Sequence, residues 1–147
     1  MEIETKAFAQ LTIYELHDLL QLRSEVFVVE QDCVYQDIDG KDEKALHVFG
    51  KKEGKIVAYA RCFAPEIYFK EASIGRIVVP ADQRKYGYGH VIMEASLKAI
   101  EREYKTKDIK LSAQTYLRKF YESHGFTQIG EGYLEDGIPH VAMTRLT

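Results

Sequence analysis

Two consecutive stretches decide the fold of this chain: SIGRIVVP at residues 73–80 and QRKYGYG at residues 83–89. The β-branched run Ile74–Val79 predicts a strand, which Pro80 ends because proline cannot donate a ladder hydrogen bond. His90–Tyr104 predicts a helix, since its apolar residues recur at helical spacing. The breadth of its apolar surface indicates that this helix is buried against a sheet.

The loop at the mouth of this helix predicts an anion-binding site. Gly87 and Gly89 allow the backbone to approach a ligand closely, and the exposed amides at a helix N-terminus favour phosphate. Arg84 and Lys85 add positive charge at the same place. A second interpretation stays open, in which the glycines only shape a tight entry into the helix. The P-loop motif and the third glycine of the dinucleotide fingerprint are absent, so neither a nucleoside triphosphate nor NAD is indicated.

The other elements follow from the same patterns on both sides of this segment. Upstream, Thr12 and Glu15 fit a capping box that starts a helix running toward Val28. The remaining predicted elements are strands at Leu46–Lys51 and Lys55–Phe63, a strand at Asp108–Ala113, a short helix at Thr115–His124, and strands at Phe126–Glu131 and Ile138–Leu146. With a first strand before the first helix, this order predicts a mixed sheet with helices packed on it, the α+β class.

The composition is that of an ordinary globular domain, with 46% hydrophobic and 29% charged residues over 147 positions. We therefore expect one domain spanning residues 1–147. A formal net charge of −3 does not favour nucleic acid, and the apolar runs are far shorter than the roughly 20 residues of a membrane helix. Cys33 and Cys62 cannot form a disulfide framework. We expect a reduced, cytoplasmic protein that binds neither nucleic acid nor membrane.

The acid-rich loop QDCVYQDIDGKDEK at residues 31–44 contains part of an EF-hand pattern. In that frame Tyr35 falls at the first ligand position and Leu46 at the twelfth, so both essential oxygens are missing. The histidines form no H-E-x-x-H motif. We predict no metal, and we expect this loop either to be solvated or to attract a cationic acceptor molecule.

At this point the sequence resembles a known family. RKYGYG after a β-branched strand resembles the R/Q-x-x-G-x-G/A pyrophosphate loop of the GNAT N-acyltransferases, and KLSAQTYLRKFYESHGF at residues 110–126 resembles their strand and helix that end in Tyr-x-x-x-Gly-Phe. Three further stretches resemble the small bacterial ElaA-like branch: LRSEVFVVEQDCVYQDIDGKD at 22–42, YARC at 59–62 and EDGIPHVAM at 135–143. The resemblance implies a mixed, mostly antiparallel sheet of about seven strands with flanking helices and a V-shaped splay between the fourth and fifth strands.

The resemblance also implies that acetyl-CoA lies in this splay. The backbone of residues 77–79 would pair with the pantetheine arm, and amides of residues 84–89 would hold the pyrophosphate. Gln114 stands where many relatives have an asparagine that touches pantetheine, and Phe120 would form a wall at the thiol end. The residues implied for cofactor binding are Ile77, Val78, Val79, Arg84, Lys85, Tyr86, Gly87, Tyr88, Gly89, Gln114 and Phe120.

The reaction that the resemblance implies is transfer of an acetyl group to a primary amine by direct attack in a ternary complex. An alkylamine has a pKa of ~10.4, so a base or an ordered water must take its proton. A backbone amide at residues 77–79 would stabilise the oxyanion, a contact of a kind worth ~3 kcal/mol. Tyr121 is the catalytic candidate, because its place in FYESHGF lets its hydroxyl donate a hydrogen bond to the leaving thiolate. Ordinary packing is its alternative role.

The acceptor side is predicted less sharply by the sequence. We rank Glu30 and His47 first as substrate-site residues, with His140 in the same class; a surface acid and structural histidines are the alternatives. Arg76 or Arg61 would either form an ion pair with a buried acid such as Glu30 or bind an acidic group of the acceptor.

Three functional hypotheses remain open at this level. The first is the acetyltransferase, acting on a small-molecule or peptide amine. The second is a CoA-binding sensor or interaction module without turnover, which the intact Tyr121 disfavours. The third is a binder of another phosphate ligand, which the Tyr-x-x-x-Gly-Phe segment disfavours. The edge strands near the C-terminal end are compatible with a homodimer.

Overall fold

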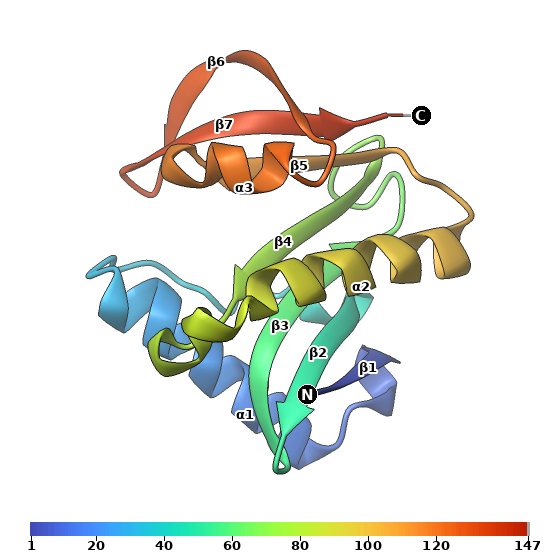
Figure 1. Cartoon of the computed structure of the whole chain (residues 1–147), viewed down its shortest axis with the longest axis vertical. Coiled ribbons are helices and arrows are strands. Elements are labelled where there is room, and N and C mark those ends of the chain that lie inside the picture. The colour runs from blue at the N-terminus through green and yellow to red at the C-terminus, as the bar shows by residue number, and fades with distance from the viewer. Residues whose placement is uncertain (147) are drawn as a thin grey trace.

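A computed structural model describes residues 1–146; Thr147, the last residue of the predicted domain, lies outside the described residues. Seven strands form one mixed sheet in the order β1-β2-β3-β4-β5-β7-β6 (Figure 1). The strands are β1 Glu2–Ala7, β2 Leu46–Lys52, β3 Lys55–Phe63, β4 Ala72–Val78, β5 Ile109–Gln114, β6 Thr127–Glu135 and β7 Ile138–Arg145. The helices are α1 Ile13–Arg23, continued by a π-helical segment at Ser24–Glu30, α2 Tyr88–Tyr104 and α3 Arg118–Glu122. The α+β class and the seven-stranded mixed sheet are as predicted.

The two faces of the sheet carry two cores. On one face α2 and α3 pack on a large core that includes Val48, Ala60, Ile92, Met93 and Leu111. On the other face α1 packs on a smaller core of Leu19, Leu22, Val26, Phe49, Ile56, Tyr59 and Val78. Alternate residues of one strand serve both cores, as a strand with two covered faces requires.

The first helix begins as its sequence predicts. The Thr12 hydroxyl accepts from the Glu15 amide at 3.0 Å, and the Glu15 carboxylate accepts from the Thr12 amide at 2.9 Å. Glu15 is buried and also pairs with Lys6 and Lys51 at 2.9 and 2.7 Å. Burial raises the pKa of Glu15, but the hydrogen bonds from Lys51, the Thr12 amide and Lys6 outweigh burial and lower the pKa to about 2.

The sheet opens between its two parallel strands. β4 and β5 pair only at Ala72↔Ile109 and Ser73↔Lys110, and beyond these residues they diverge (Figure 1). On the other side of β4, Arg61 pairs with Gly75 and Tyr59 with Val78, so β4 contains one extra residue there. Arg76 lies within this bulge with a φ of +50°. The predicted V-shaped splay between the fourth and fifth strands is therefore present.

The C-terminal part differs from its prediction in two elements. The helix predicted at residues 115–124 is a 3₁₀ turn at Thr115–Leu117 followed by the short α3. The strand predicted to end at residue 131 continues to Glu135. Its register against β7 shifts between Ile129 and Tyr133, and Gly130 in this shift has a φ of +71°. The left-handed glycine absorbs the irregularity and lets the strand continue.

Candidate active site

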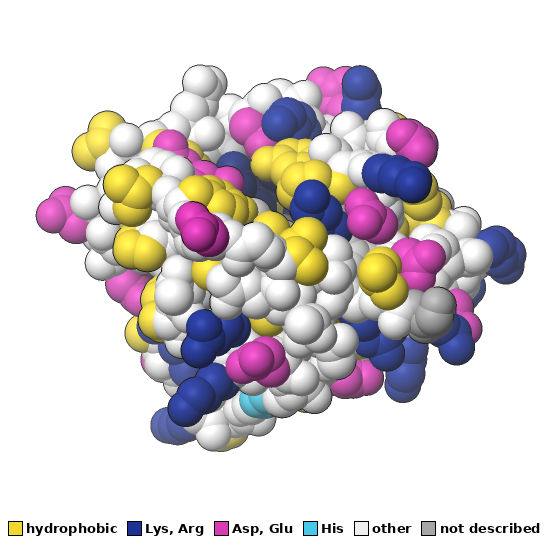
Figure 2. Space-filling model, turned by 90° about the horizontal axis from the view of Figure 1, so that it is seen from above, with side chains coloured by type: hydrophobic (Ala, Val, Ile, Leu, Met, Phe, Trp, Pro, Cys, Tyr) yellow, Lys and Arg dark blue, Asp and Glu magenta, His cyan; other side chains and the backbone are white. Residues whose placement is uncertain are grey.

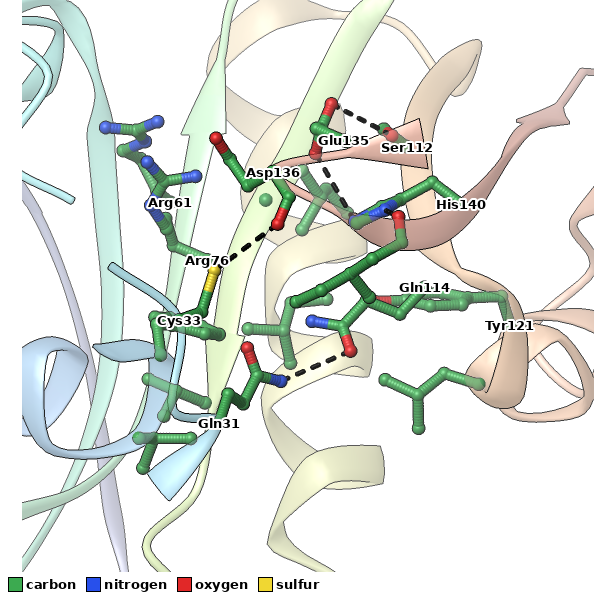
Figure 3. A pocket seen from close by; sticks show the side chains of 18 of the residues that line it. Gln31, Cys33, Arg61, Arg76, Ser112, Gln114, Tyr121, Glu135, Asp136 and His140 are labelled. Atoms are coloured by element: carbon green, nitrogen blue, oxygen red, sulfur yellow. Dashed lines mark hydrogen bonds and ion pairs between the residues drawn. The ribbon is translucent and has the colours of Figure 1, made fainter. Parts of the chain in front are cut away.

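A pocket of about 360 Å³ lies where the sheet opens. It is bounded by β4 and β5, by the end of the π-helical segment with the loop that follows it, and by the β6–β7 hairpin (Figure 3). Of the predicted site residues, those that line it are Ile77, Val78, Val79, Arg84, Gln114, Tyr121, Glu30, Arg76 and His140. Elements far apart in the sequence thus bring predicted cofactor residues and predicted substrate residues together at one site.

The glycine loop leads from β4 into α2 beside this pocket. Gly87 is the N-cap of α2 with a φ of +71°, and open space surrounds the position that a Cβ would occupy. No side chain caps the helix at Gly87, and the first amides of a helix have no partner within it. The amides of Tyr88 and Gly89 therefore offer donors for an anion. The lining of the pocket itself does not include five predicted cofactor residues of this loop: Lys85, Tyr86, Gly87, Tyr88 and Gly89.

The Arg84 side chain has partners within the protein. Its Nε donates to the Val79 carbonyl at 2.9 Å, and its Nη1 lies 2.8 Å from the Glu30 carboxylate. Glu30 therefore borders the glycine-loop end of the pocket, and its partner is Arg84. Arg76 and Arg61 do pair with buried acids, as expected, but these acids are Asp37 and Asp42 and not Glu30.

Phe120 is not among the residues that line the pocket. A Cβ on Gly89 would lie 3.5 Å from the Phe120 ring, an ordinary van der Waals contact, so Phe120 packs beside the start of α2. The ring packs against His90 and His124 with centroid distances of 4.8 and 5.2 Å. The predicted role of Phe120 as a wall of the thiol end is not supported by this placement.

Tyr121 is 7% exposed and reaches the pocket from α3. The Phe120 and Phe126 rings pack edge-on against it, with centroids 5.2 and 6.1 Å away, which fixes its orientation. Burial raises the pKa of the Tyr121 hydroxyl, with a smaller contribution from Tyr116. The hydroxyl is therefore protonated at neutral pH and serves as a hydrogen-bond donor.

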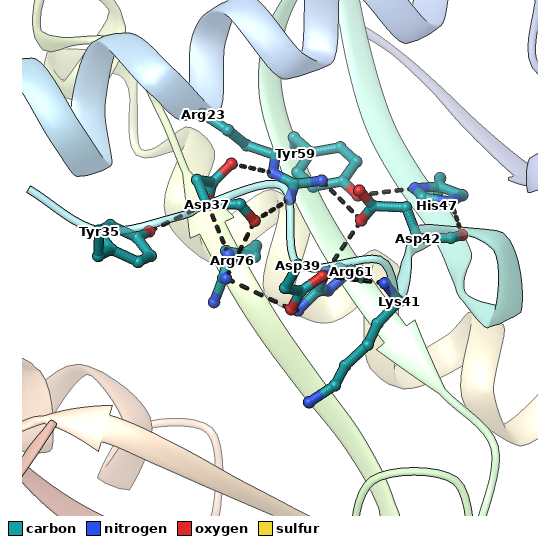
Figure 4. A network of polar contacts seen from close by, with 10 residues as sticks. All are labelled: Arg23, Tyr35, Asp37, Asp39, Lys41, Asp42, His47, Tyr59, Arg61 and Arg76. Atoms are coloured by element: carbon teal, nitrogen blue, oxygen red, sulfur yellow. Dashed lines mark hydrogen bonds and ion pairs between the residues drawn. The ribbon is translucent and has the colours of Figure 1, made fainter. Parts of the chain in front are cut away.

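The acid-rich loop is held by arginines from three elements (Figure 4). Arg23 of α1 is fully buried; its Nε bonds Asp37 at 2.9 Å and its Nη1 bonds Asp42 at 2.8 Å. Arg61 of β3 bonds Asp42 and both oxygens of Asp39, each at 2.9 Å. Asp37, Asp39 and Asp42 are therefore neutralised from within and are not free to attract a cation, whereas Asp32 and Glu43 of the same loop are exposed.

Arg76 completes this network from the bulge in β4. Its Nε donates to Asp37 Oδ1 at 2.7 Å, and its Nη2 lies 3.6 Å from Asp39. Tyr35 adds a bond from its hydroxyl to the same Asp37 oxygen at 3.0 Å. Arg76 thus lines the pocket with its charge already compensated. Within residues 1–146, the Nε of Arg61 is the one buried side-chain polar atom without a hydrogen-bond partner.

His47 is fully buried in the same network and does not line the pocket. Its Nε2 lies 2.9 Å from the Asp42 carbonyl, which can only accept, so Nε2 carries the proton. Its Nδ1, 2.7 Å from the Tyr59 hydroxyl, then accepts. Burial lowers the pKa of His47 and keeps the ring neutral. The prediction that His47 faces the acceptor groove is wrong, because a histidine that opens an apolar strand is here a satisfied core residue.

His140 is the predicted histidine that the structure brings to the pocket. It is 7% exposed and pairs in register with Gln114 across β5 and β7. Its Nε2 lies 3.3 Å from Glu135 and its Nδ1 lies 2.7 Å from the Ile138 carbonyl. Sequence reasoning missed Glu135, although it lies in the EDGIPHVAM stretch. The predicted strand ends at residue 131, so Glu135 is not placed at the end of β6.

Two contacts join the walls of the pocket (Figure 3). The Gln31 amide donates to the Gln114 side-chain oxygen at 3.2 Å, and the Cys33 thiol lies 3.5 Å from the Asp136 carbonyl. The loop after the π-helical segment therefore touches both β5 and the β6–β7 turn. These partners are 83 and 103 residues apart, and no local pattern indicates them.

The surface and the remaining polar groups add three observations. On the face seen in Figure 2, Lys and Arg side chains are interspersed with Asp and Glu, and hydrophobic side chains form several patches among them. None of the helices in residues 1–146 is long and apolar enough to cross a membrane. Over the same residues, no three His, Cys, Asp or Glu side chains gather in a way that could hold a metal ion.

Comparison with known proteins identifies the family. The sequence model of the acetyltransferase (GNAT) domain matches residues 11–147. Protein ElaA of Escherichia coli (strain K12) is 41% identical over 139 residues, which cover 93% of this chain and 91% of ElaA. The crystal structure of Escherichia coli ElaA aligns with a TM-score of 0.91 and 39% identity over 98% of each chain.

Two further structures extend the comparison. An acyl-CoA N-acyltransferase from Pseudomonas aeruginosa aligns with a TM-score of 0.93 and 42% identity over 99% of each chain. An aminoglycoside 6'-N-acetyltransferase complexed with coenzyme A aligns with a TM-score of 0.68 over 97% of this chain and 96% of that one; at 14% identity it shares the fold alone. The splayed sheet, the glycine-capped helix and these matches agree: this chain belongs to the GNAT acetyltransferase family and is a homologue of ElaA.

Proposed function

We propose that this protein is an acetyl-CoA-dependent N-acetyltransferase that moves an acetyl group to a primary amine by direct attack in a ternary complex. The observation that carries the proposal is the opening between β4 and β5 beside the N-terminus of α2. From residue 74 onward the edge of β4 that faces β5 has no strand partner among the described residues, so an extended pantetheine arm can pair there. Family membership and the coenzyme A complex of the distant structural neighbour support this cofactor.

The residues present fit coenzyme A. The diphosphate would lie at the amides of residues 84–89, where the helix N-terminus is positive and the space beside Gly87 is open. Because the Arg84 guanidinium is bonded to Val79 and Glu30, its side chain orders the loop, and the exposed Lys85 supplies positive charge. A backbone amide of residues 77–79 would donate to the oxyanion.

Tyr121 would assist the leaving group. Its protonated hydroxyl lines the pocket together with Gln114, on the side of the opening opposite residues 77–79. A phenol whose pKa is raised by burial does not transfer its proton fully to a thiolate of pKa ~8.5, but it stabilises the developing charge by a hydrogen bond. With no cysteine or serine required as a nucleophile, the amine attacks the thioester directly.

The test mixes purified protein with acetyl-CoA and a panel of amines and follows thiol release. Saturating coenzyme A, at about 100 times its Kd, should raise the free energy of unfolding by ~2.7 kcal/mol. Thiol release that requires an amine supports the transferase. Stabilisation without thiol release on any amine would favour the sensor, and no stabilisation would exclude both.

A further inference from the structure

The two walls of the acceptor end of the pocket differ in charge. One wall holds Arg61 and Arg76, whose charges are compensated by Asp37, Asp39 and Asp42. The opposite wall is the end of the β6–β7 hairpin, which presents Glu135, Asp136 and His140 (Figure 3). The side chain of Glu135 is 46% exposed, whereas that of His140 is 9% exposed. The uncompensated charge at this end is therefore acidic.

The hydrogen bonds of His140 fix where it can receive a proton. Its Nδ1 lies 2.7 Å from the Ile138 carbonyl, which only accepts, so Nδ1 carries the proton of the neutral ring. Nε2 then keeps its lone pair, and an oxygen of the Glu135 carboxylate, a second acceptor, lies 3.3 Å away. Nε2 and this oxygen are thus two acceptors close together with no donor between them among the described residues, while the other Glu135 oxygen accepts from the Ser112 hydroxyl at 3.4 Å. The Tyr133 ring stacks on His140 with centroids 6.2 Å apart and holds its plane.

A donor completes this arrangement in one of two ways: His140 takes a second proton, or a ligand donates to both groups. An alkylammonium carries three N–H donors and satisfies Nε2 and the carboxylate together. We propose, on the basis of the acetyltransferase function above, that Glu135 and His140 form the site that binds the ammonium group of the acceptor and takes its proton. Glu135 opens this site to solvent, since nearly half of its side chain is exposed.

The proton balance is simple. One N–H bond of the ammonium breaks, an Nε2–H bond forms on His140, and Glu135 stabilises the resulting imidazolium. The freed lone pair forms the N–C bond to the thioester carbonyl carbon, the C–S bond breaks, and the thiolate takes the second proton that the amine nitrogen loses. The proton on His140 returns to solvent past Glu135.

The same walls define the class of acceptor. A carboxylate beside the amino group would face Glu135 and Asp136 on one side and arginines that already hold three aspartates on the other. The acceptor is therefore a primary amine without a carboxylate next to it. Phenylethylamine against phenylalanine, and tyramine against tyrosine, are matched probes, because each pair differs only in that carboxylate.

The experiment compares wild type with His140→Asn and Glu135→Gln. The titratable side chains near His140 are Glu135 and Tyr133 of β6, which contact it, and Asp136 of the turn and Tyr121 of α3, which line the same pocket. Loss of a general base lowers kcat by about 10²-fold or more, so we expect His140→Asn to lose at least that and to lose the acidic limb of the pH–kcat profile. We expect Glu135→Gln to raise KM for the amine and lower kcat about tenfold. Exposed His17→Gln and Glu131→Gln are the matched controls, with unchanged rates.

A second readout does not depend on turnover. The ¹⁵N shifts of the His140 ring, assigned by loss of its signals in His140→Asn, should move when phenylethylamine is added to the coenzyme A complex and stay unmoved with phenylalanine. Shifts without thiol release from any amine would support the site and refute the transferase. Thiol release with unchanged rates in both variants would refute the site and support the transferase, as would equal kcat/KM for phenylethylamine and phenylalanine. If neither thiol release nor a shift of the His140 signals is observed, both the proposed site and the transferase function are refuted.

Discussion

Replacing Arg23 by methionine should destabilise this protein more than any surface change, because Arg23 is fully buried and holds two carboxylates. Its Nη2 also donates to the Asp37 carbonyl at 3.0 Å. Removing one member of a buried ion pair costs about 3–5 kcal/mol. Here Asp37 keeps Arg76 and Asp42 keeps Arg61. We therefore expect the lower end of that range, a loss of about 3 kcal/mol in the free energy of unfolding.

The effect should depend on pH in a defined direction. Burial raises the pKa of Asp42, but hydrogen bonds and charge from Arg23 and Arg61 lower it below its ordinary value of 3.8. A lowered carboxylate pKa stabilises the fold above the unfolded pKa, and this stabilisation is lost as pH falls through the folded pKa. The difference in the free energy of unfolding between wild type and Arg23→Met is therefore largest above about pH 5 and becomes smaller below about pH 4.

Urea unfolding followed by far-UV circular dichroism measures this loss, since the chain has no tryptophan. Arg118→Met is the control: Arg118 lies on α3, half-exposed, with its Nε 3.9 Å from Glu122, and its replacement should change stability by less than about 0.5 kcal/mol. A loss below about 1 kcal/mol in Arg23→Met, or a loss that grows toward acid pH, would refute the assignment of Arg23 as the centre of the network.

Three further predictions concern the catalytic tyrosine, the first helix and the glycine loop. Tyr121→Phe should slow thiol release about 10-fold or more at unchanged coenzyme A affinity; an unaltered rate would remove Tyr121 from the mechanism. Glu15→Gln should lower stability at pH 7, and its unfolding free energy should vary less between pH 4.5 and pH 2, where wild type loses the stabilisation from a carboxylate of pKa about 2. Gly87→Ala should cost ~1 kcal/mol in thermal unfolding, because φ is +71° while the space is open. Gly75→Ala, with equal space and no positive φ, should cost less; equal costs would contradict the strain argument.

The sequence predicts well those features that repeat locally. Period-two and helical patterns place β3 at Lys55–Phe63 without error, and the Thr12–Glu15 capping box forms as predicted. The glycines at the start of α2 are predicted from the residues themselves, whereas the splay between β4 and β5 is implied only by the family resemblance. In contrast, the partners of Arg23 and Arg76 lie 14 to 39 residues away, and only the folded chain selects them. His47 and His140 look alike as isolated histidines and are both buried; what separates them is that the folded chain brings His140, and not His47, to the pocket.

The two sides of the acceptor pocket are fixed to the fold in unequal ways. One depends on ion pairs that tie α1, β3 and β4 to a single loop, so few of its residues can change without loss of the fold. The other is a turn at Asp136–Gly137 that joins the edge strand β6 to its neighbour β7, and the Cys33 thiol contacts it across the cleft. Mutational drift during evolution should therefore accumulate at the hairpin, and homologues with different amine preferences should differ there while retaining the arginines.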